Sequence, residues 1–74
     1  MDRATLQQRL AKTAEQIASV QCHIARQREI IAELERNGRP ADYAMYLLAG
    51  LELLQAAYQN SRNQLLKELS KNLN

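Results

Sequence analysis

Cys22 and His23 are the only thiol and the only imidazole in the chain, and both side-chain types bind transition metals. They are adjacent in a segment with helical periodicity, so their side chains point about 100° apart and cannot chelate one metal ion. Only a symmetric dimer could gather two copies of each residue into a set of four zinc ligands. We interpret His23 as a polar residue at the helix edge and Cys22 as a small apolar one, and we expect no metal.

Glu29, Glu33 and Arg36 share one face of the same segment, and two carboxylates at this spacing could bind a metal or share a proton if buried. The apolar repeat turns both glutamates outward, so we interpret them as part of a solvated charged face. The chain has neither a glycine-rich phosphate loop nor a nucleophile beside a base. We therefore expect no enzyme, no catalytic residue and no cofactor.

Gln27 is a polar residue in the middle of an otherwise aliphatic repeat. A buried amide there needs hydrogen-bond partners, and one such residue can fix the register of two packed helices. The alternative is a side chain that extends to solvent at the rim of the contact.

These side chains belong to the first of two helices that a break at 37–40 separates. The sequence predicts one domain over 1–74, with a helix over about 3–37, a turn at 37–40 and a helix over about 40–72. Asp2 or Thr5 caps the first helix, Gly38 closes it in the left-handed conformation, and Pro40 occupies the first turn of the second. Apolar residues recur at alternating steps of three and four in the first helix: Leu6, Leu10, Thr13, Ile17, Val20, Ile24, Gln27, Ile31 and Leu34.

The second helix has a slower apolar repeat, which drifts around the helix near its end: Ala44, Leu47, Leu51, Leu54, Tyr58, Ser61 and Leu65, then Leu66, Leu69 and Leu73. Folding the chain at the break places Leu47 opposite Ile31 and Leu54 opposite Ile24. The predicted fold class is all-α: an antiparallel, coiled-coil-like hairpin of two helices.

Residues 43–58 are apolar nearly all round the second helix, with Glu52 as the only charge. One neighbouring helix cannot cover this surface, so we predict a second contact. The expected partner is a second copy, which would complete a four-helix bundle, and the alternative is a helix of another protein. Alanines at every seventh position of the first helix, from Ala4 to Ala32, offer another contact or are simply good helix formers. The predicted interface residues are Met45, Tyr46, Leu48, Gly50, Leu53 and Ala57.

Charge and composition indicate the setting of the protein. The 74 residues carry a net charge of +2 and a single cysteine, without the pattern of a signal peptide or a membrane span, so we expect a cytoplasmic protein that does not associate with membranes. Basic residues gather at the open end of the predicted hairpin, where phosphate groups could bind: Arg3, Arg9, Lys12, Arg62, Lys67 and Lys71.

The stretch from His23 to Gly38, followed by Leu47-Leu48, Leu54-Gln55 and the segment 65–69, resembles a group of small uncharacterised helical-hairpin proteins of soil and plant-associated bacteria. The likeness implies the hairpin and no activity, and Tyr58 stands where the pattern of the group has histidine. Two functions follow as hypotheses. The first is a structural or protein-interaction module that acts as a homodimer, and the second is a nucleic-acid-associated regulator that uses the basic open end.

Overall fold

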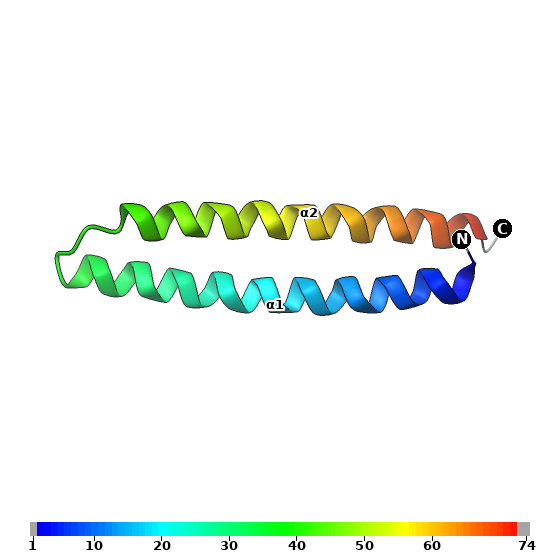
Figure 1. The fold of residues 1–74 in the computed structure, drawn as a ribbon, viewed down its shortest axis with the longest axis horizontal. Coiled ribbons are helices and arrows are strands. Elements are labelled where there is room, and N and C mark those ends of the chain that lie inside the picture. Colours follow the sequence, from blue (N-terminus) through cyan, green and yellow to red (C-terminus); the bar gives the residue numbers. More distant parts are fainter. Residues whose placement is uncertain (1, 73–74) are drawn as a thin grey trace.

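The computed structural model describes residues 2–72, which form two helices and no strand: α1 (Arg3–Arg36) and α2 (Asp42–Asn72). The helices lie antiparallel along their whole length, and their free ends meet at one end of a rod (Figure 1). The Cα atoms span 57 × 14 × 13 Å. The predicted all-α hairpin is therefore confirmed.

Asp2 caps α1. Its backbone is extended, and its side chain accepts a 2.8 Å hydrogen bond from the backbone N–H of Thr5. This bond satisfies one of the N–H groups that have no partner in the first turn of a helix. Hydrogen bonding from the Thr5 side chain, and then from its backbone N–H, lowers the pKa of Asp2.

The turn that follows α1 is a Schellman motif. The backbone N–H of Arg39 donates to the carbonyl of Leu34 at 2.9 Å, and that of Gly38 donates to Glu35 at 3.1 Å. Gly38 adopts a φ of 68°, the left-handed conformation that the sequence predicts for it. Pro40 lies before α2 and not in its first turn, because the carbonyl of Ala41 accepts the first helical bond, from Met45. The expected place of Pro40 was therefore wrong by two residues.

The face of α1 that packs against α2 is the predicted one. All nine positions of the apolar repeat are buried or half-buried, and the buried ones are Leu6, Thr13, Ile17, Val20, Ile24 and Ile31. Thr13 is only 7 % exposed, and its hydroxyl donates to the Arg9 carbonyl one turn earlier at 2.8 Å. The one polar side chain among the six is thus satisfied inside its own helix.

The packed face of α2 differs from the predicted one. It consists of buried Ala44 and a half-buried series at alternating steps of three and four: Leu48, Leu51, Gln55, Tyr58, Arg62, Leu65 and Leu69. Ala44, Leu51, Tyr58, Leu65 and Leu69 were expected there. Leu66 was expected as well but is exposed, and Leu73 lies outside the described residues. Leu47 and Leu54 were expected too, but they are 40 % and 42 % exposed and lie at the edge of the contact, and Ser61 is exposed.

The register near the turn explains this difference. Ile31 packs against Ala41 and Ala44, with Leu34 and Leu48 beside them, whereas the sequence-based pairing opposed Ile31 to Leu47. The Schellman motif brings the chain back directly onto the end of α1, and the small side chains of Ala41 and Ala44 allow close approach there. The heptad spacing then continues from Ala44, which turns Leu47 and Leu54 away from the centre of the contact.

Candidate functional site

The most exposed apolar surface of the hairpin lies on α2. Tyr43, Tyr46 and Leu53 are each 74 % exposed, and Leu47 and Leu54 lie beside them. We call the set of outward residues on this side the α2 strip: Tyr43, Tyr46, Leu47, Gly50, Leu53, Leu54 and Ala57. Water covers most of these side chains in the isolated hairpin, an arrangement that marks interaction surfaces.

The six predicted interface residues fall into three groups. Tyr46, Gly50, Leu53 and Ala57 are exposed members of the strip. Met45 is exposed as well, at 45 %, but it lies on the same edge of α2 as Glu52, about two turns away, and not on the strip. Leu48 packs against the cluster of Ile31, Ala41 and Ala44 and so belongs to the contact within the hairpin.

The strip residues recur at helical spacing, at positions 43, 46, 47, 50, 53, 54 and 57. The sequence alone does not single them out, because most other residues of the segment are apolar as well. The aromatic rings of Tyr43 and Tyr46 stack with centroids 6.5 Å apart and planes inclined by 21°. This contact places two large aromatic side chains next to each other on the exposed surface.

Gly50 lies in the middle of the strip, and no feature of the hairpin requires a glycine at this position. Its φ is not positive, and a Cβ atom added to it would meet no atom within 4 Å. A glycine inside a helix costs about 1 kcal/mol relative to alanine. Gly50 therefore lowers the stability of α2 at the centre of the most exposed apolar surface.

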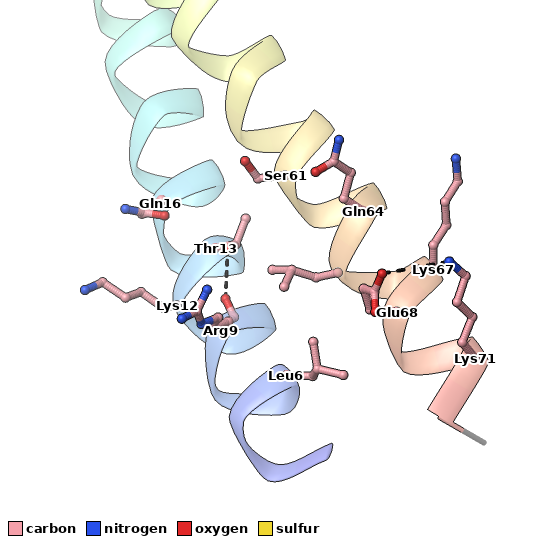
Figure 2. Close-up of a pocket in the computed structure, with 11 residues that line it drawn as sticks. Leu6, Arg9, Lys12, Thr13, Gln16, Ser61, Gln64, Lys67, Glu68 and Lys71 are labelled. Carbon is pink, nitrogen blue, oxygen red and sulfur yellow. Dashed lines mark hydrogen bonds and ion pairs between the residues drawn. The ribbon is translucent and has the colours of Figure 1, made fainter. Parts of the chain in front are cut away.

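A second candidate surface lies at the open end, where an open groove of about 940 Å³ separates the ends of α1 and α2 (Figure 2). Four of the six predicted basic residues line it: Arg9, Lys12, Lys67 and Lys71. Glu68 offsets part of this charge, since it lies 3.9 Å from the Lys71 ammonium.

The other two predicted basic residues lie elsewhere. Arg62 is half-buried in the contact between the helices and donates to the Asn63 side chain at 3.4 Å. Arg3 is exposed and does not line the groove.

Gln27 has the internal partner that one of the two alternatives predicts. Its side-chain amide nitrogen donates to the backbone carbonyl of Ala44 at 2.9 Å. Arg28, on the outer edge, adds an ion pair to Glu52 at 3.4 Å, but both side chains are largely exposed and so contribute little. The directional bond of Gln27 specifies how the two helices align near the turn.

The residues with potential for chemistry are dispersed. Cys22 and His23 are exposed, and Glu29 pairs with Arg26 at 3.3 Å on the outer face of α1. His23 lines a shallow hollow of about 260 Å³ with Val20, Leu54 and four other residues. Within residues 2–72, no three His, Cys, Asp or Glu side chains group as metal ligands.

Across the same part of the chain, neither helix has an apolar stretch long enough to cross a lipid bilayer. No family model, curated protein or solved structure matches the chain.

Proposed function

We propose that this chain is a structural protein-interaction module that acts as a homodimer of helical hairpins. The observation that carries the proposal is the exposed α2 strip, in which three large side chains each retain 74 % of their surface in water. Burial of that surface against a second copy would stabilise both hairpins by the hydrophobic effect.

The total surface of the hairpin supports this proposal. The accessible area is 5629 Å², whereas a compact monomer of 8.5 kDa exposes about 4,700 Å². The surplus of about 900 Å² is similar to the roughly 800 Å² that each partner buries in a typical stable complex. The excess accessible area of the hairpin is therefore about as large as the area that one subunit buries in a stable dimer.

Sedimentation equilibrium over a range of concentrations tests the proposal. We expect the wild-type chain to be dimeric, and we expect the double variant Tyr46→Glu with Leu53→Glu to be monomeric and to melt at a lower temperature. In a twofold contact these four introduced charges would lie close together in an apolar interface. The matched control is Asn60→Glu with Ser70→Glu, which adds the same charge to exposed positions of α2 beyond the strip.

The control should remain dimeric. A wild-type chain that is monomeric at every concentration would overturn the proposal. A strip variant as dimeric and as stable as the wild type would remove the strip from the interface.

The open end supports a second candidate function, the binding of nucleic acid. Arg9, Lys12, Lys67 and Lys71 line one groove, a spacing of cations that phosphate groups could bridge. If all four contact phosphates, affinity for double-stranded DNA should fall about a hundredfold between 50 and 200 mM salt. Fluorescence anisotropy with a labelled duplex measures this, with Arg26→Gln, on the outer face of α1, as the control variant. Absence of binding at about 50 mM salt would exclude this function.

A further inference from the structure

The α2 strip is arranged symmetrically about Gly50. Tyr43 and Ala57 each lie seven residues from it, and the remaining strip residues lie three or four residues away on either side. When two identical helices pair antiparallel about a twofold axis, residues at equal distances before and after the axis meet. An axis at Gly50 would place Tyr43 of one copy against the small side chain of Ala57 in the other.

The same axis would oppose leucines to bulky apolar residues. Leu47 would meet Leu53, and Tyr46 would meet Leu54. Each layer of the contact would thus be apolar on both sides, because each copy presents the same sequence in the opposite direction.

Gly50 itself would face Gly50 at the centre. The space above it is open, and nothing within the hairpin explains the absence of a side chain there. Helix axes approach most closely where the residues between them are small. From these observations we infer that two copies pair antiparallel through α2, with the twofold axis at Gly50. This inference rests on the proposed homodimer and specifies its geometry.

The extent of the strip agrees with that geometry. With the axis at Gly50, the first residue of α2, Asp42, lies opposite Tyr58, so the two α2 helices overlap over residues 42–58 only. The apolar strip ends at Ala57, and the positions that continue its spacing along α2 are polar: Ser61, Gln64 and Glu68. The strip thus stops where the partner helix would begin.

Charge favours the antiparallel arrangement over a parallel one. A parallel pair would align Asp42 with Asp42 and bring both basic grooves to the same end of the dimer. The antiparallel pair separates the grooves to opposite ends. From the 57 Å length of one hairpin and the rise of a helix, the dimer would be about 80 Å long.

Disulfide trapping tests the axis. In a Cys22→Ser background, which removes the exposed natural thiol, Tyr43→Cys and Ala57→Cys chains are prepared separately and as a mixture refolded together. We expect a cross-linked dimer in the oxidised mixture and none in either chain alone. In the inferred geometry residue 43 of one copy faces residue 57 of the other. The two copies of residue 43 lie about 21 Å apart, beyond the reach of a disulfide.

A third chain with Gly50→Cys should cross-link to itself, while Asn60→Cys should not. Cross-linking of Tyr43→Cys to itself would establish a parallel pair and overturn the inference. A dimeric mass without any of the expected cross-links would also overturn the axis at Gly50, yet leave the proposed homodimer standing. A monomeric mass for the Cys22→Ser parent would overturn both.

Discussion

Replacement of Ile24 by Asp gives the sharpest test of the packing between α1 and α2. Ile24 is 5 % exposed in the middle of α1, where its side chain packs on α2. Loss of a buried isoleucine side chain costs about 2–3 kcal/mol. An aspartate in its place must also leave water without a cationic partner, which brings the total to about 4–5 kcal/mol.

A domain of this size has roughly 3–5 kcal/mol of stability from its core, so the Ile24→Asp chain should be largely unfolded at 25 °C. Circular dichroism at 222 nm measures the loss of helix directly. Cys22→Asp is the matched control, because it introduces the same charge two residues away at an exposed position. A melting midpoint for Ile24→Asp equal to that of Cys22→Asp would show that Ile24 does not face α2.

Three further predictions concern single side chains. Thr13→Val should stabilise the hairpin by about 0.5–1 kcal/mol, because it replaces a buried hydroxyl by a methyl group while the Arg9 carbonyl keeps its helical hydrogen bond. The midpoint of urea unfolding should rise, and a lower midpoint would contradict the prediction. Gly38→Ala should destabilise by about 1 kcal/mol through its positive φ, with Gly38→Asn as the milder control, and equal urea midpoints for Ala and Gly would refute the role of the turn. Because the pKa of Asp2 is lowered on folding, the stability from this cap is present above the aspartate pKa of the unfolded chain and is lost as pH falls through the lower folded value. Asp2→Asn should therefore flatten the acid side of the stability profile in pH-dependent melts.

The sequence predicts α1 more completely than α2, for a physical reason. In α1 the large apolar residues, apart from Ile30, occupy one stripe among polar residues and alanines, so the periodicity indicates one main packed face, and all nine positions were correct. In α2, residues 43–58 are apolar on nearly every side, so periodicity cannot decide which stripe faces α1. The prediction was correct for Ala44, Leu51, Tyr58 and Leu65, but it placed Leu47 and Leu54 in the contact, where the structure has Leu48 and Gln55.

The turn decides between the stripes, through the exact residue at which α2 begins. A start at Asp42 rather than near Pro40, together with the close packing of Ala44 on Ile31, rotates the helix and leaves Leu47 and Leu54 at its edge. The hydrogen bond from Gln27 to Ala44 depends on the same register, and the sequence identified the donor but not the acceptor. The strip was located within the correct segment, but its members depended on this rotation.

We expect the cluster of Ile31, Ala41 and Ala44 beside the turn to form first when the hairpin folds. Its members lie within 14 residues of sequence, so the loop they close costs little chain entropy, whereas Leu6 and Leu65, which line one groove, come together across most of the chain. Once the two helices are in contact beside the turn, each further turn of helix adds to an existing contact between α1 and α2. Small helical domains rich in local contacts fold within microseconds to milliseconds. Opening runs in the reverse direction, from the free ends inward. We therefore expect the basic groove to form last and to fray first, and the segment around Gly50 to open later than the groove.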